Sequence, residues 1–300
     1  MSTRLFSDIA VMRTLVKREF LEQRLLFVLL PLAVMLFIAG AFTVITMSIL
    51  DPGPRPITVL EFASFPAPAR GQLIHNMYSA INNVLIVSYW CAMLLYFLMT
   101  LYQQRKDKSI LFWNSMPVSD AQTIVSKLLA GMIGAQAVVL ASMLVLHLFL
   151  LLALLGYGAF HDIDGWQTFV TPYAWLTSLL ALVPSMLVSS LWTLPIYGWL
   201  LLVSARARSI PFAWAIAPFA VVLGFEYLLA EDRPMSEAVF SHLFPFEFVD
   251  ISHIARSPAG LRPLPLMMLQ QAPWLELALS GVLGVALLYA AIRCNRSEES

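Results

Sequence analysis

Residue types that carry out catalysis are present in this sequence, but their spacing matches none of the common catalytic patterns. Its five histidines stand at positions 75, 147, 161, 242 and 253, and none begins the His-Glu-x-x-His pattern of zinc proteases. No two glycines stand four positions apart, so the Gly-x-Ser-x-Gly turn of serine hydrolases is missing. A P-loop places glycine before a lysine that is followed by Ser or Thr, and the one such lysine, Lys108, follows Asp107 instead. We therefore expect no catalytic residue here, and ATP hydrolysis would need another chain.

Two further groups of polar residues could bind a ligand, and each has a simpler explanation. His161, Asp162 and Asp164 offer a few metal ligands, but a polar turn between apolar segments has the same composition, so we predict no metal. A charged residue inside an apolar segment, such as Glu226, points by default to function, although Glu231 and Asp232 also fit an ordinary helix end. Similarly, Gln136 and Ser189 could line a polar path or bond across helices. We keep Gln136, Ser189 and Glu226 as candidate pathway residues.

The most informative stretch lies between positions 103 and 127. A basic cluster of Arg105, Lys106 and Lys108 suits a position near lipid phosphates. An apolar and aromatic patch follows at Ile110, Leu111, Phe112 and Trp113, and Pro117 ends it. Next, Ser119 with Gln122 three residues later forms a capping box that begins the following helix. The patch either anchors the loop in the membrane interface or docks a partner protein, because exposed aromatic side chains are costly in water.

This stretch resembles a loop of bacterial ABC-2 type transporter permeases. The run from Arg105 to Asp120 reads Arg-Lys-Asp-Lys-Ser-Ile-Leu-Phe-Trp-Asn-Ser-Met-Pro-Val-Ser-Asp and stands between the second and third of six predicted spans. In that family the loop carries the coupling helix that meets the ATP-binding subunit. The similarity at motif level is confined to this loop, and the rest of the chain is similar in topology.

The resemblance implies a dimeric permease driven by two nucleotide-binding subunits. The second permease chain would be identical or homologous, and ATP and magnesium would be bound by the partner ATPase, with no cofactor in this chain. Export is the direction that the resemblance implies, and no nucleic acid is expected as a partner. The residues implied to couple to the ATPase are Arg105, Lys106, Asp107, Lys108, Ile110, Leu111, Phe112 and Trp113.

The elements that must position this loop are membrane-spanning helices. The chain is 60% hydrophobic and 12% charged, whereas soluble domains have about 45–50% and about 25%. Six long apolar runs approach or reach the ~20 residues that cross a bilayer. These predicted spans are Leu25 to Leu50, Asn83 to Tyr102, Leu128 to Gly156, Tyr173 to Val203, Ile210 to Ala230 and Trp274 to Ile292. Residues 1–300 are therefore expected to form a single all-α membrane domain, which the resemblance implies is a permease.

The distribution of basic residues predicts the orientation of these spans. Thirteen of the eighteen Lys and Arg residues fall in the first, third, fifth and last segments outside the spans. The positive-inside rule then places both termini of a multi-pass protein in the cytoplasm, and the resemblance implies that its membrane is the bacterial inner membrane. Trp192, Trp199 and Trp214 are expected to anchor helices in the cytoplasmic interface.

Two segments outside the spans also have patterns of their own. Within residues 1–24, Ile9, Met12, Val16 and Phe20 share one helical face, which is typical of a helix that lies in the interface. The outer loop 231–273 is rich in aromatic residues, and short re-entrant helices there would bury them.

Two other functions fit the same sequence. One is a multi-span membrane enzyme that uses Glu226 and the outer histidines, and the other is a membrane scaffold or sensor without transport activity.

Overall fold

The computed structural model describes residues 2–48, 59–107, 118–160, 162–171, 175–229, 234–243 and 273–297, and this part of the chain contains helices and no strand. The predicted all-α class is confirmed for these residues. In chain order the elements are α1 (Ser2–Glu22), the π-helical η1 (Leu25–Leu29), α2 (Leu30–Ser48), α3 (Val59–Ser64), α4 (Ala67–Lys106), α6 (Asp120–Leu129), the π-helical η2 (Ala130–Ala135), α7 (Gln136–Phe160), the π-helical η3 (Trp166–Val170), α8 (Trp175–Trp192), α9 (Leu194–Arg206), α10 (Pro211–Leu229), α11 (Pro234–Leu243) and α14 (Trp274–Ser297).

Five helical segments of the described part are long and apolar enough to cross a membrane. They are Leu25–Val44, Ala67–Lys106, Asp120–Phe160, Pro211–Leu228 and Trp274–Asn295. Leu182–Trp192 and Leu194–Arg206 form a pair bent by 49°, and they make a sixth span if the pair is counted as one. The second and third of these segments, at 40 and 41 residues, are far longer than the predicted apolar runs, so both extend beyond a bilayer about 30 Å thick.

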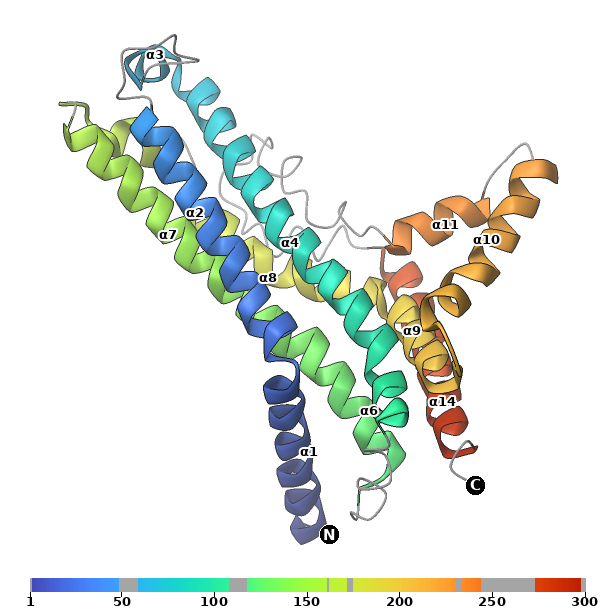
Figure 1. Ribbon diagram of the computed structural model, residues 1–300. Coiled ribbons are helices and arrows are strands. Elements are labelled where there is room, and N and C mark those ends of the chain that lie inside the picture. Colours follow the sequence, from blue (N-terminus) through green and yellow to red (C-terminus); the bar gives the residue numbers. More distant parts are fainter. Residues whose placement is uncertain are drawn as a thin grey trace.

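Helix α4 is the central element of the fold (Figure 1). It runs diagonally through the molecule and contacts α2, α7, α9 and α10. Its inner face is buried along most of its length, from Ile74 through Leu85 and Met93 to Leu101. Because these residues recur at helical spacing, one stripe of α4 supplies much of the hydrophobic core.

The predicted helix in residues 1–24 is present as α1. The face that it turns to the bundle centres on Leu15 and Glu19, with Phe20 packed beside them, whereas Ile9 is 59% exposed. Phe20 also lies against η2, since a Cβ on Gly134 would stand only 2.3 Å from its ring. Thus α1 is packed against the bundle through the end of its length nearest the first span.

The predicted span Tyr173–Val203 is broken at Thr193. Pro195 lacks the N–H that a continuous helix would bond to the carbonyl four residues earlier, so the chain starts a new helix there. Two glycines allow the second half, α9, to lie close to α14. A Cβ on Gly198 would stand 3.0 Å from the Gly284 carbonyl oxygen.

Helix α11 confirms one short helix within the segment 231–273 that was predicted to be an outer loop, and most of the rest of that segment lies outside the described residues. Its end packs at the α8–α9 break, where the Trp192 indole donates to the Ser241 carbonyl at 2.9 Å and stacks on His242. The prediction that Trp192 anchors a helix in the interface is wrong. This side chain is 5% exposed, because α11 folds back and covers it.

Candidate functional site

Four helix ends gather at one end of the bundle, around the segment predicted to couple to a partner. Helix α4 ends at Lys106 and α6 begins at Asp120, and both chain termini lie toward the same end (Figure 1). The predicted capping box at the start of α6 is confirmed, since Ser119 and Gln122 bond reciprocally. The predicted coupling residues Lys108, Ile110, Leu111, Phe112 and Trp113 lie outside the described residues. We call this the loop-bearing end.

A buried ion pair joins α1 to α6 at this end. The Lys127 Nζ lies 2.7 Å from the Glu19 Oε1, and both side chains are fully buried. Lys127 also donates to the Thr100 hydroxyl at 2.9 Å, and the Tyr96 hydroxyl donates to the Glu19 Oε2 at 3.0 Å. Arg18 donates to Glu19 from the same helix at 2.7 Å. Three elements, α1, α4 and α6, therefore meet at one charged cluster inside the protein.

This cluster determines the ionisation of Glu19. Burial opposes the charged form, but Lys127 and Arg18 together outweigh it, so the pKa of the Glu19 carboxyl lies below its ordinary value of 4.5. The carboxylate is thus charged at neutral pH. A buried pair of this kind holds its geometry strongly, because separating the charges would leave each of them unpaired in a medium of low dielectric constant.

A second connection ties the end of α4 to the end of α9. The Arg105 guanidinium donates to the carbonyls of Ser204 and Ala207, the latter at 3.1 Å. The Ser204 hydroxyl in turn accepts from the backbone N–H groups of Leu101 and Tyr102 at 3.1 Å each. Arg105 was predicted as a coupling residue, and the structure places it as a clamp between two helices. Its neighbours Lys106 and Asp107 are exposed.

A third connection joins α6 to α14. The Asn295 amide donates to the Asp120 carboxylate at 3.3 Å, across 175 positions of sequence. Both helices that flank segment 108–117 are therefore bonded to other elements: α4 to α9, and α6 to α1 and α14. The two helices that flank segment 108–117 thus connect it to α1, α9 and α14.

Two of the three predicted pathway residues lie together. Gln136 and Ser189 line a cavity of about 30 Å³ among α4, α7, α8 and α9, which is room for about one water molecule. The Gln136 Oε1 accepts from the Ser190 hydroxyl at 3.1 Å, while its Nε2 has no protein partner among the described residues. Gln136 directly follows the π-helical η2, and such segments are frequent at functional sites.

The third predicted pathway residue, Glu226, lies apart from this cavity. Its carboxylate accepts from the backbone N–H groups of Met235 and Ser236, at 2.6 and 2.7 Å, and from the Ser236 hydroxyl. A carboxylate at the start of a helix satisfies amides that have no helical partner. Glu226 thus caps α11, and this contact accounts for its burial.

One of the acidic residues that were weighed as metal ligands near the α7–η3 turn, and for which no metal was predicted, has a similar structural role. The Asp164 carboxylate accepts from the backbone N–H groups of Trp166 and Gln167 at 3.0 and 3.1 Å, and His161 lies outside the described residues. Within the described ranges, no three His, Cys, Asp or Glu residues are grouped as a metal site would require.

Sequence reasoning missed the Glu19–Lys127 pair. Lys127 was counted only among the basic residues of a loop, and Glu19 was not singled out. A signal was present, since both charged residues stand close to strongly apolar runs, where a charge needs a partner. Nothing in the sequence indicates that residues 108 positions apart pair with each other.

Taken together, the fold and the site define an all-helical protein with several apolar helices, consistent with a multi-pass membrane protein. Its charged connections lie at the end that carries the segment 108–117. Compared with known proteins, the chain matches no family model, no curated protein and no solved structure.

Proposed function

We propose that this chain is the transmembrane permease subunit of an ATP-binding cassette transporter. A separate ATPase subunit would supply the energy, with ATP and magnesium bound there, and the cargo would move outward, as in the exporters that its loop resembles. On this proposal the chain crosses the bacterial inner membrane six times, with both termini in the cytoplasm, and pairs with a second permease chain.

One observation carries the proposal: the aromatic segment 108–117 connects two helices that are each bonded to further elements of the bundle. A partner that pushes on this loop would act through Lys127 on α1 and through Arg105 on α9. Such a linkage is what a permease needs to convert ATPase movement into movement of its helices. The Glu226 carboxylate, by contrast, is engaged in capping α11, which argues against its use as the acid or base of an enzyme.

The proposal is tested by purifying the chain from its native membrane in mild detergent and measuring the ATPase activity that co-purifies. Replacing both aromatics, Phe112→Ala with Trp113→Ala, should lower the recovered ATPase on the order of tenfold, because buried aromatic anchors dominate interface energies. The matched control is Phe160→Ala with Trp166→Ala, a pair of exposed aromatics (90% and 64%) of which the first ends the third span and the second lies beyond it. Equal ATPase recovery from both double variants would refute the coupling role.

A further inference from the structure

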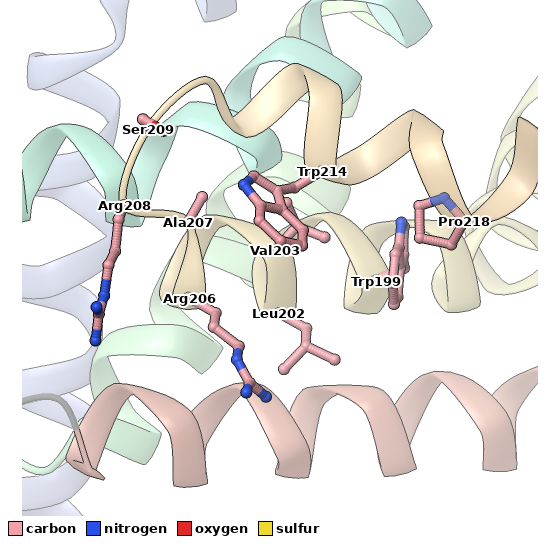
Figure 2. A pocket seen from close by; sticks show the side chains of 9 residues that line it. All are labelled: Trp199, Leu202, Val203, Arg206, Ala207, Arg208, Ser209, Trp214 and Pro218. Atoms are coloured by element: carbon pink, nitrogen blue, oxygen red, sulfur yellow. The ribbon is translucent and has the colours of Figure 1, made fainter.

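A groove of about 580 Å³ lies between α9 and α10, next to the turn that joins them. In Figure 2, Arg206 and Arg208 lie toward one end of it, while Trp199 and Pro218 lie at the other. Trp214 lies between, over Val203. The groove has the volume of a ligand site, and it changes from cationic to apolar along its length.

The cationic end of the groove lies at the loop-bearing end of the bundle. Arg206 is the last residue of α9, whose end is bonded to Arg105 of α4. Both Arg206 and Arg208 are exposed, and neither forms an ion pair or hydrogen bond with another residue that the structure describes. Two unpaired guanidinium groups at one end of a groove attract an anion, and guanidinium binds phosphate with bidentate geometry.

The apolar end is rigid and open. The Trp199 indole donates to the Ala215 carbonyl at 3.2 Å and meets Phe219 edge-on, with ring centroids 5.7 Å apart. The Trp214 side chain is 62% exposed. An aromatic wall that is fixed by its own contacts and left uncovered suits a hydrocarbon chain.

We propose that this groove binds one phospholipid with an anionic headgroup. Its phosphate lies against Arg206 and Arg208, and an acyl chain runs along Trp214 toward Trp199 and Pro218. From Trp199 to Arg206, the last residue of α9, the helical rise amounts to about 10 Å, which accommodates a headgroup and the first part of an acyl chain. Basic pockets between membrane helices recognise lipid headgroups in this way. The inference stands independently of the transport proposal, since it rests on this groove alone.

The test counts lipids bound to the purified chain by native mass spectrometry, after equilibration with mixed micelles of phosphatidylglycerol and phosphatidylcholine. We expect one phosphatidylglycerol to be retained in preference to phosphatidylcholine. Replacing both arginines, Arg206→Gln with Arg208→Gln, should weaken this preference about thirtyfold, because each basic group near a lipid surface contributes about a factor of five.

The matched control is Arg13→Gln with Lys17→Gln, which removes two exposed charges from α1 outside the groove. This control should leave the retained lipid in place, and equal losses of lipid in the two double variants would contradict the proposed site.

A second arm of the experiment adds inorganic phosphate. If the acyl chain contributes to binding, inorganic phosphate does not displace the lipid. If phosphate does displace it, the groove binds anions only, and the lipid proposal is wrong. Trp214→Ala, which keeps both arginines, should shorten the retention of the lipid while preserving the headgroup preference.

Discussion

At the scale of single residues, the Glu19–Lys127 pair is the least expected feature of the protein. Two opposite charges stand 2.7 Å apart with no exposed surface. Burying them is costly, and the cost is recovered only because Thr100, Tyr96 and Arg18 satisfy the remaining donors and acceptors. We interpret the pair as a device that fixes the position of α1 on α6, with little net effect on stability.

This interpretation predicts different results for breaking the pair and for removing it. Lys127→Met alone should lower the free energy of unfolding by up to about 3–5 kcal/mol, because it leaves the buried Glu19 carboxylate with Arg18 of the same helix as its only charged partner. Glu19→Met combined with Lys127→Met should recover most of that loss, since two well-packed apolar side chains need no partner. Unfolding of the purified variants in mixed micelles measures both values. A double variant as unstable as Lys127→Met would show that packing, and not the unpaired charge, causes the loss.

The lowered pKa of Glu19 also predicts a dependence on pH. The folded-state pKa lies below the unfolded value, so the stabilisation is fully present above about pH 4.5 and is lost as the pH falls through the folded-state pKa. The midpoint of thermal unfolding should therefore fall in acid for the natural chain, and by less for Glu19→Gln.

Glu22 provides the contrasting variant for this measurement. Burial is the main cause that raises the pKa of the Glu22 carboxyl above its ordinary value. The nearby Glu19 charge raises it further, and Arg18 lowers it by less than these two effects together. Its ionisation therefore opposes folding as the pH rises, the opposite sign to Glu19. In the Glu22→Gln variant the midpoint of thermal unfolding should still fall in acid. If it does not fall, Glu22 and not Glu19 causes the dependence on pH.

At the scale of elements, the contact between α9 and α14 is made through glycine. A Cβ on Gly284 would stand 2.6 Å from the Leu194 Cγ, and one on Gly198 would meet backbone of α14. Small residues let membrane helices approach closely, and dispersion contacts between the helices then hold them together. Since α14 also bonds to α6 through Asn295, this contact links α9 to the loop-bearing end.

Substituting these glycines tests the contact. Gly198→Ala should lower the free energy of unfolding by about 1–3 kcal/mol, because the added methyl group overlaps the Gly284 carbonyl and the helices must separate. Gly281→Ala, on the partner helix α14 and with nothing within 4 Å of the new Cβ, should be neutral or stabilising by up to about 1 kcal/mol. Equal effects at the two positions would mean that helix propensity, and not packing, governs the response.

Much of the element order was predictable from the sequence, and the details that were not depend on tertiary contacts. Long apolar runs located the spans, and Ser119 with Gln122 correctly predicted where α6 begins. Pro195 predicts a kink in the span Tyr173–Val203, and the chain does break beside it at Thr193, but membrane helices tolerate proline and only packing decides how far the chain bends. The burial of Trp192 and the capping role of Glu226 both depend on where α11 folds back, which no local pattern specifies.

At the scale of the whole molecule, the helices diverge from the loop-bearing end. Figure 1 shows α2, α7 and the upper part of α4 on one side and α10, α11 and α14 on the other. The spans Leu25–Val44 and Pro211–Leu228 are each only 11% buried within the chain, so lipid or another protein chain must cover them. In the proposed transporter, ATPase movement at one end would change the separation of the two groups of helices.

The most direct test of the central claim is photo-crosslinking from position 113 in living cells. A photoreactive phenylalanine analogue placed there should crosslink to a protein that contains a P-loop, and ATP analogues that trap the ATPase should change the yield. The same analogue at position 166, beyond the opposite end of the third span, should give no such product. If position 113 crosslinks only to lipid, or to no protein with a P-loop, the chain is not coupled to an ATPase through this segment and the account is wrong.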